Sequence, residues 1–213
     1  MKKPSIQTII IAILILLTLI FAYDKWGPGI LSSIKYKFSG SDTKDQLQIG
    51  SATAKVRIIE YYSYACEYCR AFENDAKPDI IENYVSSGLV KFIFRPVDSD
   101  LGEAALCANE QGKFLEYHDS LFRNALNISK PEDLKVLAKN VGMDEEKFWE
   151  CYASGKYQSL VQGWYNDLMS EFTKHKTPAE ERGTPSFIIG SNIITGAQPY
   201  SVFAEALEKE LAK

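Results

Sequence analysis

The stretch "VRIIEYYSYACEYCRAF", residues 56–72, decides the fold of this 213-residue chain. Its first half is rich in β-branched and aromatic residues, which predicts a buried strand over residues 55–64. Its second half predicts a helix over about residues 66–86, kinked at Pro78, because proline removes one backbone hydrogen bond. Cys66 and Cys69 therefore lie where a strand ends and a helix begins.

Two cysteines separated by two residues can hold a metal, attach a haem, form a structural disulfide or exchange electrons. A structural zinc site usually takes two close pairs of ligands, but Cys107 and Cys151 are isolated and the chain has only two histidines. A c-type haem needs histidine directly after the second cysteine, where this chain has Arg70. We therefore expect neither a metal nor a haem.

The position of the pair favours redox chemistry over a structural disulfide. The free N–H groups and the positive dipole end of a helix can stabilise a thiolate at Cys66. Cys69, one turn further on, can displace a partner from a mixed disulfide and should be the more buried. A ring this small would stabilise the fold little. The sequence thus predicts a nucleophile at Cys66, a resolving Cys69 and no dissociable cofactor.

The rest of the chain predicts an α/β domain over residues 51–213 with an all-helical insertion. A second strand is expected at residues 89–97, and a strand–helix–strand order favours a parallel crossover. Helical spacing with little strand character then runs over about residues 98–177. Strands resume with "SFIIG", residues 186–190, whose following "SN" turn predicts a hairpin, and an amphipathic helix closes the chain.

The amino terminus predicts export. Residues 1–23 carry two lysines followed by a long apolar run, and Ile20 lies where a cleavage site prefers a small residue. We expect an uncleaved signal-anchor that spans the membrane once, with a cleaved signal peptide as the alternative. The lysines would keep the N-terminus in the cytoplasm, which leaves the domain outside. Residues 24–50, mixed and polar, are expected to be a linker.

Composition limits the partners. The formal net charge is -4 and the sequence has no long run of lysine and arginine, which argues against a nucleic-acid partner. The even number of cysteines, four, suits an oxidising compartment.

Several motifs together resemble a known family. "VRIIEYYSYACEYCRAF", Pro78, "GTPSFIIG" and "GAQPYSVFAEAL" follow one another over roughly residues 48–211 as in the DsbA-like thiol-disulfide oxidoreductases. The resemblance implies a thioredoxin-like fold, exported substrate proteins that contain cysteines, and a membrane redox partner that recycles the enzyme. Net oxidation is favoured. A reductase or isomerase, or a non-catalytic binding module or chaperone, remains the alternative.

The resemblance also implies roles for residues outside the cysteine motif. Pro185, after Thr184, matches a cis-proline that shapes the substrate site beside the active disulfide. Glu60, six residues before Cys66, matches a buried acid that relays the proton of Cys69. The sequence alone leaves a solvent-facing glutamate open at this position.

Two further cysteines are expected to pair. Some relatives carry a second, structural disulfide in the inserted domain, which Cys107 and Cys151 would form here; two buried free thiols are the alternative. His118, on an apolar stripe, is expected to be a packing residue.

The dipeptide between the active cysteines departs from the family pattern. Strong oxidases of the family often have proline and histidine there, whereas this chain has Glu67 and Tyr68. A carboxylate beside a thiolate repels it, so the disulfide should be harder to reduce. We expect a reduction potential between those of thioredoxin and DsbA.

Overall fold

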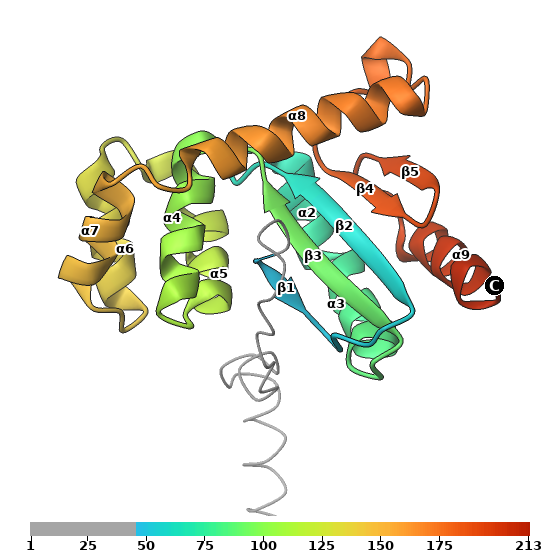
Figure 1. The fold of residues 1–213 in the computed structure, drawn as a ribbon, viewed down its shortest axis with the longest axis horizontal. Helices are drawn as coiled ribbons and strands as arrows, with labels where there is room; N and C mark the ends of the chain where they lie inside the picture. The colour runs from blue at the N-terminus through green and yellow to red at the C-terminus, as the bar shows by residue number, and fades with distance from the viewer. Residues whose placement is uncertain (1–45) are drawn as a thin grey trace, which may run out of the picture. The chain divides into compact units, whose positions relative to one another are not determined.

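The predicted buried strand forms the centre of a five-stranded sheet (Figure 1). This computed structural model describes residues 46–213. The strand order is β1-β3-β2-β4-β5. Strand β2 pairs in parallel with β3, as the crossover predicted, and antiparallel with β4. The strands are β1 (Gln48–Ile49), β2 (Val56–Tyr62), β3 (Val90–Pro96), β4 (Ser186–Ile189) and β5 (Asn192–Thr195).

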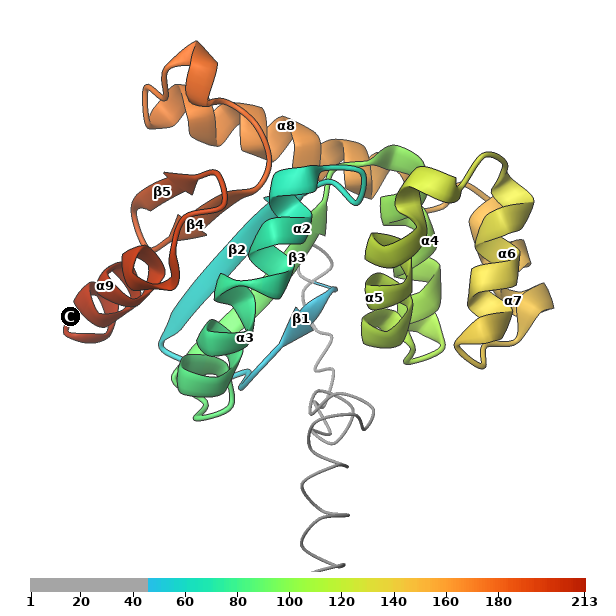
Figure 2. The ribbon, with the colours of Figure 1, turned by 180° about the vertical axis from the view of Figure 1, so that it is seen from behind.

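Strand β2 is apolar almost throughout because both of its faces are covered. Arg57 is the one exposed residue of the strand. Helices α2, α3 and α9 (Tyr200–Leu211) cover one face of the sheet (Figure 2). Their contact with the sheet is aromatic: the ring centroid of Phe72 lies 4.4 Å from that of Phe187 and 5.2 Å from that of Phe203.

The helical stretch after Cys66 is broken rather than only kinked. It consists of α2 (Glu67–Asn74), α3 (Ala76–Ile80) and a π-helical turn, η2 (Ile81–Val85). Pro78 causes the break one turn before itself, because it has no N–H for the carbonyl of Asn74 and its ring crowds that carbonyl. The prediction of one kinked helix over residues 66–86 is therefore wrong in detail, because the stretch is divided into three segments. The residue responsible, Pro78, was identified from the sequence.

Five α-helices separate β3 from β4, all within the residues predicted as helical. The last of them, α8, runs from the inserted helices back across the end of the sheet (Figure 1). Arg95 of β3 donates to Asp167 of α8 at 3.2 Å and to the Tyr61 hydroxyl at 2.7 Å, which ties α8 to the sheet. The inserted helices are α4 (Ser99–Glu110), α5 (Phe114–Asn124), α6 (Pro131–Asn140), α7 (Glu145–Ala153) and α8 (Gln158–Lys174).

Two boundaries differ from expectation. The predicted linker ends before residue 50, because Gln48 and Ile49 pair with the edge strand β3. The hairpin turn is Gly190–Ser191, one residue earlier than predicted. Gly190 has φ +59°, a backbone conformation that favours glycine, and a β-carbon there would also require the Glu210 carboxylate to move.

The signal-anchor predicted over residues 1–23 and nearly all of the linker lie outside the described residues. Within residues 46–213, none of the helices has the length and apolar character needed to cross a membrane.

Candidate active site

Cys66 is the N-cap of α2. Its backbone is extended (φ -82°, ψ 124°), and its sulfur accepts a hydrogen bond from the Cys69 backbone N–H at 3.4 Å. The sulfur thus takes the place of the oxygen that a serine or aspartate cap would supply. A negative charge on this atom would face the free N–H groups and the positive end of the helix. The side chain is half-buried, so a substrate can reach it.

Cys69 lies beneath Cys66. Its side chain is fully buried, and its sulfur accepts from the Ser63 backbone N–H at 3.5 Å. Burial, and to a smaller extent the nearby Glu60 carboxyl, raise the pKa of the Cys69 thiol. Both cysteines are free thiols here, so the structure corresponds to the reduced state. The geometry separates an accessible sulfur from a protected one.

The Thr184–Pro185 peptide bond is cis, which the family resemblance implied. The Thr184 carbonyl accepts a hydrogen bond from the Cys66 thiol at 3.2 Å. Pro185 is buried and leads directly into β4, which pairs with β2. The sheet therefore brings two segments 118 positions apart together at the accessible sulfur.

Glu60 is completely buried, so the solvent-facing alternative is wrong. Neither of its carboxyl oxygens has a hydrogen-bond partner among the described residues. Burial, with a smaller effect from the Glu73 charge, raises the pKa of Glu60 well above its ordinary value, while Lys77 acts in the opposite sense. Burial therefore favours the protonated form of the Glu60 carboxyl over the carboxylate.

A second buried carboxylate was not identified from the sequence. Glu73 lies one turn after Cys69 on α2 and forms an ion pair with Lys77 of α3, which is also buried. Burial alone would raise the pKa of Glu73, but Lys77 and His118 outweigh it and lower the pKa to about 2. The i, i+4 spacing of Cys69, Glu73 and Lys77 was the available signal, since it places all three on one helical face.

The two residues between the cysteines both point outward. Glu67 is exposed, and Tyr68 is 68% exposed, the largest fraction but one among the large apolar and aromatic side chains of residues 46–213. Neither side chain covers the Cys69 sulfur.

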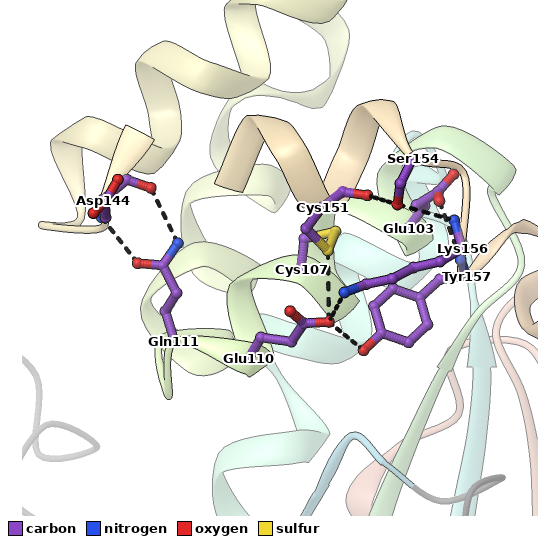
Figure 3. Close-up of a disulfide and its surroundings, with 9 residues drawn as sticks. All are labelled: Glu103, Cys107, Glu110, Gln111, Asp144, Cys151, Ser154, Lys156 and Tyr157. Atoms are coloured by element: carbon purple, nitrogen blue, oxygen red, sulfur yellow. Dashed lines mark hydrogen bonds and ion pairs between the residues drawn. A yellow bond between two sulfur atoms is a disulfide. The ribbon is translucent and has the colours of Figure 1, made fainter. Parts of the chain in front are cut away.

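Cys107 and Cys151 form a disulfide between α4 and α7 (Figure 3). Their Cα atoms are 5.7 Å apart and Cys107 is fully buried. Beside the bond, the Glu110 carboxylate accepts from Lys156 at 2.7 Å and from the Tyr157 hydroxyl, so the segment that leads into α8 is held to α4 (Figure 3). These two cysteines lie on the inserted helices, whereas Cys66 and Cys69 lie at the start of α2. Residues 46–213 contain no cluster of three or more histidine, cysteine or acidic side chains that could hold a metal ion.

Comparison with known proteins agrees with this geometry. The family model described as thioredoxin matches residues 42–209. The chain belongs to the thioredoxin family.

Within that family the protein is DsbA-like. A Bacillus cereus relative named "Probable disulfide bond formation protein D" is 26% identical over 186 residues, which cover 79% of this chain and 80% of that protein. The structure of oxidised BdbD from Bacillus subtilis has a TM-score of 0.64 and 24% identity, and covers 81% of this chain and 96% of that one. Wolbachia pipientis α-DsbA1 has a TM-score of 0.61 and 20% identity, with 78% and 90% covered.

This DsbA-like protein is a thiol-disulfide oxidoreductase. Its cysteine pair, its helix N-terminus and its cis-proline lie together as that chemistry requires.

Proposed function

We propose that this oxidoreductase donates disulfide bonds to exported proteins outside the cytoplasm. The observation that carries the proposal is the environment of Cys66, whose sulfur caps α2 while its twin is buried. A helix N-terminus stabilises the Cys66 thiolate and hence the reduced enzyme, which makes the disulfide form a better oxidant. Net oxidation is therefore favoured over reduction.

The reaction moves two electrons from two substrate thiols to the enzyme disulfide. A substrate thiolate attacks the accessible Cys66 sulfur, the Cys66–Cys69 bond breaks, and Cys69 leaves as a thiolate. A second substrate thiolate then attacks the substrate sulfur of this mixed disulfide, which forms the substrate disulfide and releases the Cys66 thiolate.

Glu60 supplies the proton that the leaving Cys69 needs. A buried thiolate is costly, and the Glu60 carboxyl, whose protonated form is favoured by burial, lies close enough to influence the ionisation of Cys69. When the enzyme is reoxidised, Glu60 accepts the proton back before Cys69 attacks. Thr184 and Pro185 would present a backbone edge to the substrate segment, while Glu67 and Tyr68 border it.

The proposed location rests on the N-terminal sequence, and the proposed recycling partner rests on the family resemblance. The apolar N-terminal segment would anchor the domain on the outer side of the membrane, as the positive-inside bias requires. A membrane redox protein would accept the two electrons and restore the Cys66–Cys69 disulfide.

The direction of electron flow is tested by trapping thiols with a maleimide after acid quenching of living cells. We expect most of the protein to have the Cys66–Cys69 disulfide at steady state. A mostly reduced population would contradict net oxidation and support a reductase or isomerase.

The alternative of a non-catalytic binding module or chaperone is tested by two substitutions. Cys66→Ser should abolish turnover, whereas Cys69→Ser should accumulate mixed disulfides with client proteins. A binding module would keep its function in both variants, and neither would trap clients.

A further inference from the structure

His118 of α5 is buried among aromatic rings, yet both of its ring nitrogens have polar partners. The ring is fully buried, with the centroids of Phe94, Phe114 and Phe122 at 5.2, 5.2 and 5.0 Å. Packing, which the sequence predicted, explains these contacts. It does not explain the polar ones.

The Nδ1 atom faces two hydroxyl groups of the central strand region. The hydroxyls of Tyr62 and Tyr64 each lie 3.1 Å from Nδ1 and 3.0 Å from each other. One hydroxyl can donate to Nδ1 and the other to the first hydroxyl. This arrangement leaves the ring proton on Nε2.

The Nε2 atom faces the ion pair of the active-site helix. It lies 3.3 Å from a Glu73 carboxylate oxygen and 3.2 Å from the Lys77 ammonium nitrogen. A proton on Nε2 can be donated to Glu73, the same oxygen that Lys77 contacts. His118 thus connects the inserted helices to the segment that follows the cysteines.

Both sides of the imidazole lead back to Cys69. Tyr62 and Tyr64 flank Ser63, whose backbone N–H donates to the Cys69 sulfur. On the other side, Glu73 lies one helical turn after Cys69. The imidazole therefore contacts both segments that enclose the buried sulfur.

The same ion pair lies beside Glu60. Glu60 is the register partner of Phe94, so their side chains share one face of the sheet, and the Lys77 ammonium lies 4.6 Å from the Phe94 ring centroid. The charge of Glu73 raises the pKa of Glu60, and the charge of Lys77 lowers it.

The charged and titratable groups around His118 come from several elements of the fold. They come from β2 and the loop after it, from α2, from α3, and from α5 itself: Tyr62, Tyr64, Glu73, Lys77 and Asp119. Burial, and then the Lys77 charge, lower the pKa of His118, so the imidazole is neutral. The positive charge of Lys77 and the negative charge of Glu73 then compensate each other inside the protein.

We propose that His118 is a positioning residue for proton transfer between Glu60 and Cys69, because its Nε2 atom holds the Glu73–Lys77 pair in place beside Glu60. The inference rests on the proton-relay role proposed for Glu60. Without the Nε2 contact, the Lys77 ammonium is free to move away from Glu60, and Glu60 holds its proton more tightly. Cys69 then needs a higher pH to lose its own.

The test follows the attack of Cys69 on a mixed disulfide. The full-length protein is converted to the Cys66 adduct of 5-thio-2-nitrobenzoate at low pH and then moved to a series of higher pH values. Cys69 passes its proton to Glu60, its thiolate forms the bond to Cys66, and the coloured thiolate leaves. The pH dependence of this release reports the proton transfer.

Three substitutions of His118 distinguish the effect of the Nδ1 contacts from that of the Nε2 contacts. His118→Phe keeps the aromatic packing and removes both nitrogens. His118→Gln places an amide near Nε2, and His118→Asn places one near Nδ1. In His118→Phe and His118→Asn, we expect the inflection of the release rate plotted against pH to lie about half a pH unit or more above that of the wild type. Such a shift makes release approximately threefold slower at pH 7. His118→Gln should stay close to the wild type.

Phe122→Leu is the matched control, because it weakens the same aromatic cage without removing a nitrogen. It should lower stability but leave the inflection unchanged. An unchanged inflection in a folded His118→Phe, or equal shifts in His118→Phe and Phe122→Leu, would overturn the inference. Failure of the wild type itself to release the coloured thiolate would instead refute the proposed resolving role of Cys69.

Discussion

At the scale of single residues, two carboxyl groups beneath the redox pair have pKa values shifted in opposite directions. Burial without a partner raises the pKa of Glu60, whereas Lys77 and His118 lower the pKa of Glu73. The relay proposed for Glu60 needs a group whose proton can move, and Glu73 supplies a fixed charge beside it.

The raised pKa of Glu60 predicts a stability effect with a definite sign. Between the ordinary glutamate pKa of about 4.3 and its raised folded value, Glu60 binds more proton in the folded state, so its contribution to stability falls as pH rises. Glu60→Gln removes this loss. The variant should gain about 1.4 kcal/mol over the wild type per pH unit across that window.

Urea denaturation of both reduced proteins from pH 4 to pH 8 measures this difference. The stability advantage of Glu60→Gln should widen toward alkaline pH. An advantage that narrowed would show that Glu60 is ionised in the folded protein.

The exposed Glu67 predicts a modest change in redox potential. Its carboxylate follows Cys66 directly, but water and salt screen it. Glu67→Gln should raise the potential by about 10–20 mV at low ionic strength, with the wild type between about -270 and -120 mV. Equilibration with glutathione buffers measures both values, and the shift should shrink in 1 M salt. A drop in potential would contradict the repulsion.

At the scale of elements, the break at Asp75 keeps Lys77 within reach of Glu73. Pro78 ends α2, and α3 starts anew at Ala76. Lys77 is 7% exposed in this arrangement and meets Glu73, four positions before it. The ion pair therefore joins α2 to α3 across the break.

The Cys107–Cys151 disulfide should stabilise the inserted helices without taking part in exchange. It closes a loop of 44 residues between α4 and α7, for which the chain-entropy model gives about 4 kcal/mol. The Cys107→Ala/Cys151→Ala double variant should lose stability of that order in urea. Its release rate in the mixed-disulfide assay should match the wild type, measured below the unfolding transition. A changed rate with an unchanged stability would reverse this assignment.

At the scale of the whole molecule, the sheet and the inserted helices meet at polar contacts. Arg95 joins Tyr61 and Asp167, and His118 joins the tyrosines to the active-site helix. The insertion therefore contacts the groups that surround Cys69 as well as the inner strands β2 and β3.

The N-terminal segment is expected to locate the enzyme rather than to shape its site. Residues 46–213 contain the sheet, the redox pair and the relay groups. A chain starting at residue 42 should therefore keep the exchange rate in solution but leave the membrane fraction of cells. Fractionation followed by immunoblotting checks this, and membrane retention of the shortened chain would refute the anchor.

Much of the fold was predictable from local patterns. The aromatic and β-branched run fixed the position of β2, the helical spacing of residues 98–177 fixed the insertion, and Cys66 fell at a helix start. The two-residue strand β1 was missed because pairs of residues show no period. It exists only because β3 offers an edge.

The sequence by itself determined the chemistry: a CxxC pair at a strand–helix junction, followed much later by a threonine–proline step, allows little else. Only the tertiary structure decided which groups tune it. Glu60, Lys77 and His118 come from a strand, a helix and the insertion, and burial raises the pKa of Glu60 and lowers that of His118. Burial and charge coupling act through space, between residues that no local pattern connects.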